Sequence, residues 1–329
     1  MNNQSKGPKV VALGGGNGLS TLLRGLKGRV TDLTAIVTVA DDGGGSGALR
    51  RDLNMPPPGD IRNCMQALAN TEPLMEQLLG YRFTEGSLAG QAFGNLVLAA
   101  LNGVSDSFDQ AVARMSQVLA ISGRILPVTN ADVRLEAVFE NGARVVGESQ
   151  ICDFKKGQNC RIRCVRLLPE RPPALPAVVS AIESADLILL GPGSLYTSVI
   201  PNLLVDGVAQ AIARSGALKV YICNIMTQDG ETEEMTAAEH VLALMEHGLA
   251  GLDICLCNSA SVPDHLLERY RAEDANPIVI DTQRLADIGV EAVAAPLTSL
   301  GAQYARHDPH RLAQAVLELY SERAHTKIF

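Results

Sequence analysis

Residues 9–20 read Lys9-Val10-Val11-Ala12-Leu13-Gly14-Gly15-Gly16-Asn17-Gly18-Leu19-Ser20, and this stretch decides the fold. An apolar run comes first, four glycines follow within five positions, and the residues after Gly18 have helical character. Glycine lets the backbone approach an anion closely, and the positive end of a helix dipole favours phosphate. We therefore predict a phosphate cradle at Gly14–Gly18, with a plain strand-to-helix turn as the alternative.

This glycine loop matches neither standard nucleotide motif. The dinucleotide fingerprint requires glycine or alanine where Leu19 stands, and no Lys-Ser or Lys-Thr pair completes a P-loop. An NAD-dependent oxidoreductase is therefore disfavoured, although the loop still suits a phosphorylated, nucleotide-like ligand.

Apolar runs like the first one recur along the chain with helix-like segments between them. Strands that are buried on both faces lose the apolar/polar alternation, so these runs predict a mainly parallel sheet within an α/β, Rossmann-like, three-layer fold. The predicted strands are Lys9–Leu13, Ala35–Ala40, Leu187–Leu190, Lys219–Cys223, Asp253–Cys257 and Pro277–Ile280.

We expect one domain over residues 1–329, with an antiparallel β-hairpin appendage at 131–165 inside it. The appendage is predicted from Val133–Phe139 and Arg144–Glu148, which flank an Asn141-Gly142 turn signal. Residues 61–120 between the first strands and the appendage are predicted to be mainly helical by their apolar spacing.

Composition excludes several classes of protein. The chain has 329 residues, of which 47% are hydrophobic and 19% charged, with a formal net charge of −8, so it is globular and poorly suited to nucleic acid. No apolar stretch is long enough to span a bilayer, and we expect a cytoplasmic protein. The seven cysteines include no Cys-x-x-Cys pair and the six histidines form no ligand array, so no protein-built transition-metal site is expected.

Two acids follow the second predicted strand, at Asp41 and Asp42, ahead of another glycine-rich turn. In that position an acid can bind ribose hydroxyls, hold Mg²⁺ beside a phosphate, or act as a general base. Asp42 has a further interpretation as a simple turn cap.

Two more loops extend the predicted site. Gly59–Asn63 starts a helix, with Asp60 suited to the N-cap and with Arg62 and Asn63 in the first turn, where they can face an anion. Gly191–Ser198 repeats the pattern of strand, glycine loop and hydroxyls, and two cradles suit a ligand with two phosphates. Ser194 lacks the Gly-x-Ser-x-Gly context of a hydrolase nucleophile.

Taken together, these loops resemble those of the gluconeogenesis factor (YvcK) family, within the wider CofD-like group. The matching stretches are Val11–Leu23, Ala35–Leu49, Pro56–Asn63, Gly94-Asn95-Leu96, Gly191–Leu204, Ile222–Thr232, Cys257–Pro263, Tyr270 and Arg306-His307-Asp308. The chain departs from the family's common pattern at Asn17 and Gly45, where threonine and serine are usual, which puts those hydroxyl contacts in doubt.

The resemblance implies a regulator of growth and cell shape on gluconeogenic carbon sources that binds UDP-sugars such as UDP-N-acetylglucosamine and acts through protein partners. It also implies that Tyr270 stacks on the base and Arg306 reaches a phosphate. For assembly, our expectation is a homo-oligomer. The related CofD enzymes imply the alternative, a Mg²⁺-dependent transferase resembling 2-phospho-L-lactate transferase, in which Asp41 and Asp42 would be catalytic and Asp42 would hold Mg²⁺.

The residues predicted to contact the ligand come from all of these loops. They are Gly14, Gly15, Gly16, Asn17, Gly18, Asp41, Asp42, Arg62, Asn63, Asn95, Gly191, Gly193, Ser194, Asn224, Thr227, Asn258, Tyr270 and Arg306.

Overall fold

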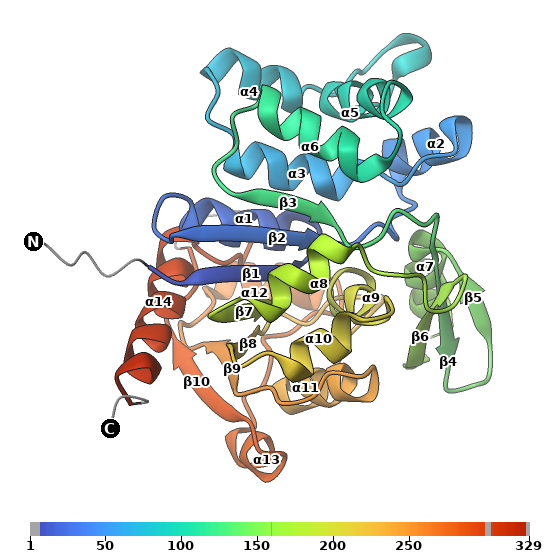
Figure 1. Cartoon of the computed structure of the whole chain (residues 1–329). Helices are drawn as coiled ribbons and strands as arrows, with labels where there is room; N and C mark the ends of the chain where they lie inside the picture. Colours follow the sequence, from blue (N-terminus) through green and yellow to red (C-terminus); the bar gives the residue numbers. More distant parts are fainter. Residues whose placement is uncertain (1–6, 159, 300–303, 327–329) are drawn as a thin grey trace, which may run out of the picture.

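The computed structural model describes residues 7–158, 160–299 and 304–326, and within them seven strands form one parallel sheet. These strands are β1 (Lys9–Gly14), β2 (Asp32–Val37), β3 (Arg124–Pro127), β7 (Leu187–Leu190), β8 (Leu218–Ile222), β9 (Ile254–Asn258) and β10 (Glu291–Ala295). Their order across the sheet is β10-β9-β8-β7-β1-β2-β3 (Figure 1). The predicted α/β fold is confirmed.

The strand order reverses at β1, which lies between β2 and β7. The chain first builds the sheet outward from β1 to β3, and later returns to the other side of β1 and builds outward from β7 to β10. Leu13 therefore pairs with Ile36 on one side and with Leu190 on the other. In an open parallel sheet, a ligand crevice forms at this reversal, outside the carboxyl ends of the strands.

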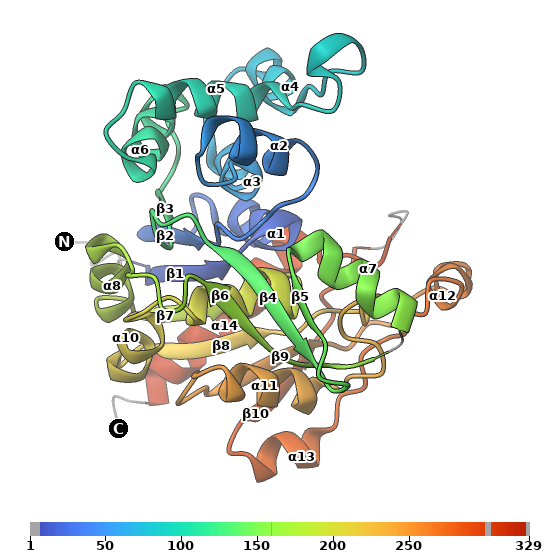
Figure 2. The ribbon, with the colours of Figure 1, turned by 90° about the vertical axis from the view of Figure 1, so that its right-hand side faces the viewer.

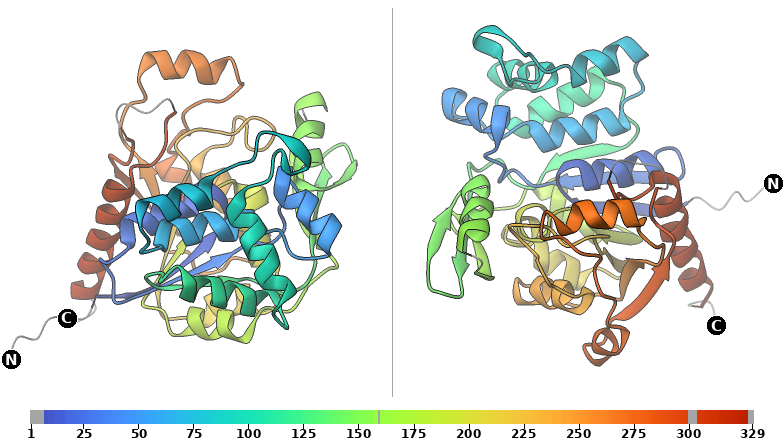
Figure 3. Two further views of the ribbon diagram at one scale, coloured as in Figure 1. Left: turned by 90° about the horizontal axis from the view of Figure 1, so that it is seen from above. Right: turned by 180° about the vertical axis from the view of Figure 1, so that it is seen from behind.

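Helices cover both faces of the sheet. The helices α8 (Pro176–Glu183) and α10 (Val208–Arg214) lie in front of it in Figure 1, whereas α1 (Gly16–Leu26) and α14 (Pro309–Thr326) lie behind it, as the rear view of Figure 3 shows. Strands covered on both sides are buried throughout, and residues 10–14 of β1 are buried without interruption. The core runs between these layers.

Most of the helices before β3 in the sequence form a group beside this strand. The group beside β3 contains α2 (Gly44–Leu53), α3 (Gly59–Leu68), α4 (Pro73–Gly80), α5 (Phe93–Gly103) and α6 (Phe108–Val118) (Figure 2). The other elements are η1 (Gly86–Leu88), η2 (Leu195–Val199), α9 (Ile200–Leu203), α11 (Ala237–Glu246), α12 (Asp264–Arg271) and α13 (Thr282–Asp287). No helix in the described part of the chain has both the length and the hydropathy needed to cross a membrane.

A small antiparallel sheet stands apart from the main one, at the right of Figure 1. It consists of β4 (Arg134–Phe139), β5 (Arg144–Val146) and β6 (Ile162–Leu168) in the order β5-β4-β6, and it is covered by α7 (Glu148–Gln158). The predicted hairpin is present, with Val138 paired to Arg144. Phe139 and Phe154, whose ring centroids are 4.6 Å apart, join the sheet to α7, a helix that the sequence did not indicate.

One predicted strand is wrong. Among the described residues, Pro277–Ile280 makes only an isolated bridge to Met226, and its Ile278 and Ile280 side chains pack on the core without entering the sheet, whereas Val279 is exposed. The last strand is instead β10, an edge strand whose residues are half-exposed. An edge strand carries a weaker apolar signal than a central strand, and β3 at the other edge was missed in the same way.

The contact of α1 with α14 generates a prediction. A Cβ atom on Gly25 would lie 1.9 Å from the Pro309 carbonyl oxygen, so the start of α14 can reach its position only because residue 25 has no side chain. We expect Gly25→Ala to lower the free energy of unfolding by about 1–3 kcal/mol, measured by urea denaturation. Gly103→Ala is the control, because a Cβ atom there meets nothing within 4 Å. An equal effect of both substitutions would contradict the packing argument.

Candidate functional site

A cavity of about 560 Å³ opens where β1 and β7 end. It lies at the reversal of strand order, and segments distant in sequence meet there. Its lining is Gly15, Gly16, Asn17, Gly18, Thr21, Lys156, Pro192, Gly193, Ser194, Ser198, Asn224, Ile225, Met226, Thr227, Gln228, Asp229, Tyr270, Glu273, Ala275, Tyr304, Ala305, Arg306 and His307.

The two glycine loops touch one another at the floor of this cavity. A Cβ atom on Gly18 would lie 2.4 Å from the carbonyl oxygen of Pro192, so glycine is required for the contact. The second loop is held in turn by Asn224, whose Nδ2 donates to the Gly193 carbonyl oxygen at 2.9 Å and whose Oδ1 accepts from the Gly193 N–H at 3.3 Å. The loops therefore form one rigid surface of backbone groups.

Asp60 lies directly beneath the first glycine loop. Its side chain was expected to cap its own helix, but α3 begins at Gly59 with Pro58 as its N-cap and no side-chain cap. The Asp60 carboxyl instead accepts a hydrogen bond from the Gly16 backbone, and its oxygen would be 2.4 Å from a Cβ atom on Gly15. It therefore sits at the positive end of α1, where a helix favours negative charge.

Several buried carboxyl groups in this part of the structure have raised pKa values. Burial, and then the charge of Asp41, raises the pKa of Asp60 to about 7. Burial, followed by the charges of Asp41, Asp60 and Glu231, raises the pKa of Glu148 to about 9. Burial raises the pKa of Glu231 to about 7, although its Oε1 accepts hydrogen bonds from the N–H groups of Tyr196 and Thr197 at 2.7 and 2.9 Å. Near neutral pH, much of this acidic group is protonated.

Another part of the cavity lining is aromatic and cationic. Tyr270 and Tyr304 meet edge to face, with ring centroids 6.5 Å apart, and the Arg306 guanidinium lies 5.1 Å from the Tyr304 ring centroid. The Tyr270 hydroxyl accepts from the Ala305 N–H at 3.2 Å, which ties α12 to the segment before α14. Lys156 lines the cavity from α7 and makes a 2.8 Å ion pair with Asp229.

The structure brings most of the predicted loop residues together. Ten of them line the cavity: Gly15, Gly16, Asn17, Gly18, Gly193, Ser194, Asn224, Thr227, Tyr270 and Arg306. The others lie outside this lining: Gly14, Asp41, Asp42, Arg62, Asn63, Asn95, Gly191 and Asn258.

Several of the outlying residues have structural partners. Asp42 accepts hydrogen bonds from the N–H and the hydroxyl of Ser149 at 3.1 and 3.2 Å, and so anchors the first turn of α7. Arg62 donates to Gln66 at 3.0 Å, and Asn258 accepts from the Leu297 N–H at 3.0 Å.

Some residues at the site were not predicted from the sequence. Lys156 and Glu148 belong to α7, in a segment that the hairpin pattern described as appendage, and they reach the site only because α7 docks beside the loop after β8. Tyr304 was overlooked next to Arg306, and its aromatic side chain close to a basic residue was the available signal.

Comparisons with known proteins agree with this architecture. Residues 10–298 match the family model of 2-phospho-L-lactate transferase CofD. The chain is 47% identical to the protein of Bacillus subtilis named gluconeogenesis factor, over 96% of this chain and 99% of that one. It is 42% identical to the protein of the same name from Listeria innocua, over 99% of this chain and 100% of that one.

A solved structure is also similar. The crystal structure of a UPF0052 family member from Bacillus halodurans superposes with a TM-score of 0.91 at 43% identity, covering 94% of this chain and 99% of that chain. The family model and the relatives each extend over nearly all of the described sheet and its loops. The chain therefore belongs to the gluconeogenesis factor family of CofD-like proteins.

Proposed function

We propose that the cavity binds a nucleotide sugar of the UDP-N-acetylglucosamine type and that the protein is a non-catalytic regulator acting through protein partners. One observation carries the proposal: two glycine loops line the same cavity as Tyr270, Tyr304 and Arg306. A diphosphate fits the loops, because they offer backbone N–H groups and a helix N-terminus. A base fits the tyrosines.

The volume supports a ligand of this size. Small-molecule sites usually measure about 300–1,000 Å³, and this cavity measures about 560 Å³. Its lining also contains amide and hydroxyl groups, at Asn17, Ser194 and Gln228, that can hydrogen-bond to sugar hydroxyls.

The charges around the loops are compatible with phosphate. Lys156 and Arg306 supply cations to the lining. The raised pKa values of Asp60 and Glu148 reduce the negative charge beneath the glycine loop near neutral pH. A diphosphate therefore meets less repulsion than the number of acids suggests.

A second candidate is a Mg²⁺-dependent transferase of phosphorylated groups, supported by the match to the CofD family model and by the buried carboxyls near the loop. Mg²⁺ is commonly held by one or two carboxylates together with substrate phosphates. The donor chemistry of Asp41 and Asp60 fits such a cation, which would neutralise phosphate charge. Asp42 is engaged with Ser149. If the protein turns over a phosphorylated donor, and Asp41→Asn abolishes this turnover, the transferase is favoured over the regulator.

The nucleotide-sugar proposal predicts a specific loss of affinity. In calorimetric titrations with UDP-N-acetylglucosamine, we expect Tyr270→Ala to weaken binding roughly tenfold to a hundredfold, by analogy with base stacking on aromatic side chains. Tyr270→Phe is the matched control, since it keeps the ring, and we expect it to bind within about threefold of the wild type. Arg306→Ala should weaken the binding of UDP-N-acetylglucosamine more than the binding of uridine, because the guanidinium interacts with phosphate.

Ligand binding by the wild-type protein decides the nucleotide-sugar proposal. Binding of the wild type should also raise its Tm with ligand concentration, as mass action requires. A folded wild type that neither binds nor gains stability with millimolar UDP-sugars would refute the nucleotide-sugar assignment.

The buried acid generates a prediction about pH. Because the pKa of Asp60 is about 7 in the folded state, the folded protein binds a proton that the unfolded chain has lost, and this group makes stability fall as pH rises from about 4 to 7. Asp60→Asn removes that loss. We expect the free energy of unfolding of the variant to exceed that of the wild type by on the order of 1–4 kcal/mol at pH 8 and by much less at pH 5. The measurement is urea denaturation in the presence of EDTA.

The exposed Asp52 on α2 provides the control for this experiment. Asp52→Asn removes a carboxyl from the surface, and its pH profile should run parallel to that of the wild type. If the pH profile of Asp60→Asn also runs parallel to that of the wild type, burial does not raise the pKa of Asp60 and the prediction is wrong.

A further inference from the structure

Three cysteine side chains meet in the core beneath the cavity. Cys255 and Cys257 are alternate residues of β9, so both point to the same face of the sheet. Tyr221 of β8 pairs with Cys255, and the Cys223 N–H continues the pairing beyond the strand by donating to the Leu256 carbonyl oxygen at 3.0 Å. Cys223 is therefore brought to the same face as the other two thiols.

The sulfur atoms are close enough to share one ion. Each of the three lies within 4.8 Å of the other two, and the Sγ atoms of Cys255 and Cys257 are 3.6 Å apart. A zinc ion bound at the usual Zn–S distance of about 2.3 Å separates its sulfur ligands by about 3.8 Å. This is the only group of three or more histidine, cysteine or acidic side chains with such spacing among the described residues.

Mutual contact, rather than burial alone, separates this cluster from an ordinary core cysteine. Cys223 and Cys255 are 0% exposed and Cys257 is 2% exposed. A single buried thiol is a small apolar residue, as Cys64 in α3 is. Three thiols in mutual contact form a set of soft ligands that favours thiophilic ions such as Zn²⁺ and Cu⁺.

His240 on α11 supplies an independent observation. Its side chain is fully buried, and Nδ1 lies 2.8 Å from the Thr236 carbonyl oxygen, which can only accept a hydrogen bond. The proton must therefore be on Nδ1, which leaves a lone pair on Nε2, an atom without a hydrogen-bond partner in the described structure. Metal-binding histidines commonly use the same arrangement, with one ring nitrogen donating to a backbone carbonyl and the other free for the metal.

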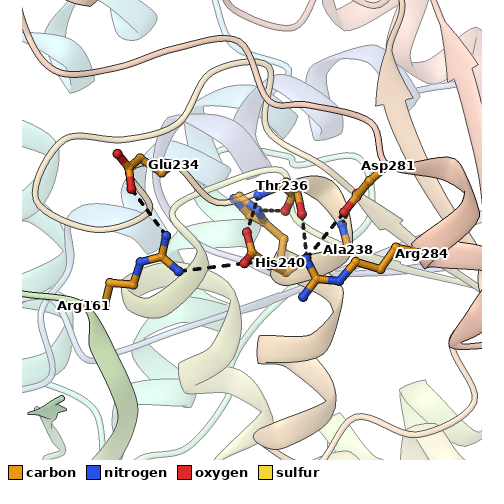
Figure 4. A network of polar contacts seen from close by, with 8 residues as sticks. Arg161, Glu234, Thr236, Ala238, His240, Asp281 and Arg284 are labelled. Carbon is orange, nitrogen blue, oxygen red and sulfur yellow. Dashed lines mark hydrogen bonds and ion pairs between the residues drawn. The ribbon is translucent and has the colours of Figure 1, made fainter.

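The start of α11 holds this histidine in place (Figure 4). Thr236 and Glu239 form a reciprocal capping box, and the Ala238 N–H donates to Asp281 at 2.8 Å. His240 is also close enough to Cys257 for the two side chains to interact electrostatically. It lies outside the set of ligand atoms that are all within 4.8 Å of one another, so ligation requires its ring to move towards the thiols.

We propose that Cys223, Cys255 and Cys257 bind one thiophilic metal ion of the zinc class, with His240 as the fourth ligand. The ion takes the three sulfurs as thiolates, so its binding releases their protons to solvent. A divalent ion offsets two of the three thiolate charges and leaves one net negative charge, whereas three unpaired thiolates would be far more costly to bury.

The position of the ion gives it a structural role at the cavity. Cys223 directly precedes Asn224, the residue that clamps Gly193, and the His307 ring hydrogen-bonds to the Cys223 backbone. A metal at Cys223 therefore stabilises the end of β8 beneath the ligand, without contacting the ligand.

Metal titration of the full-length protein tests the proposal. The protein is stripped of metal with a chelator, kept reduced with a phosphine, and titrated first with Co²⁺ and then with Zn²⁺. We expect one Co²⁺ per chain, with the visible bands of a tetrahedral site and thiolate charge-transfer absorption, release of protons, and displacement of Co²⁺ by Zn²⁺. Zn²⁺ should also raise the Tm.

Variants assign the ligands. The double variant Cys255→Val, Cys257→Val keeps small, β-forming side chains in the core and should fold but lose stoichiometric metal binding. Cys64→Ala, which removes a buried thiol elsewhere, should bind as the wild type does. His240→Ala should lower the affinity for Co²⁺ at least tenfold and reduce the visible absorption bands of the tetrahedral site.

Two results would overturn the site: no metal uptake by the folded, reduced wild type, or undiminished uptake by the folded double variant. Unchanged Co²⁺ affinity and spectrum in His240→Ala would overturn the role of His240.

Discussion

The contact between the Gly18 backbone and the Pro192 carbonyl is the constraint on which the site depends. It exists because β1 and β7, separated by more than half of the chain, are neighbours in the sheet and end at the same edge. With the two loops this close, a residue with a Cβ atom at position 18 would push them apart. The cavity is thus a consequence of strand order, and its floor is made of backbone because side chains have no room there.

Around this floor the chain gathers groups of opposite character. Carboxyl groups lie beneath the first loop and have raised pKa values, whereas Arg306 and Lys156 line the cavity itself. Acids that would repel a phosphate when ionised are protonated to a large extent near neutral pH, because burial and mutual repulsion oppose their ionisation. The same acids would bind a cation well. This balance is compatible with both proposed functions, the nucleotide-sugar regulator and the Mg²⁺-dependent transferase.

The parts that surround the cavity come from separate structural layers. The glycine loops belong to the main sheet, Lys156 comes from α7 of the appendage, and Tyr270 and Arg306 come from α12 and the segment before α14. The appendage is joined to the site through Asp42, which holds the start of α7, and through the ion pair of Lys156 with Asp229. Asp42, a predicted ligand contact, thus lies outside the cavity lining and positions a helix that contributes to it.

The sequence alone determined the parallel α/β fold, the hairpin at Asn141-Gly142 and the two glycine loops, because buried strands and tight turns leave local patterns of apolar residues and glycines. It missed the short edge strand β3 and the half-exposed edge strand β10, which carry weak patterns, and it placed a strand at Pro277–Ile280, where Ile278 and Ile280 pack on the core outside the sheet. Only the tertiary structure decided which loops meet, since contacts between distant segments have no local signature. For that reason it alone assembled the acids around Asp60, the aromatic wall beside Arg306, and the thiols of Cys223, Cys255 and Cys257, which no spacing in the sequence connects.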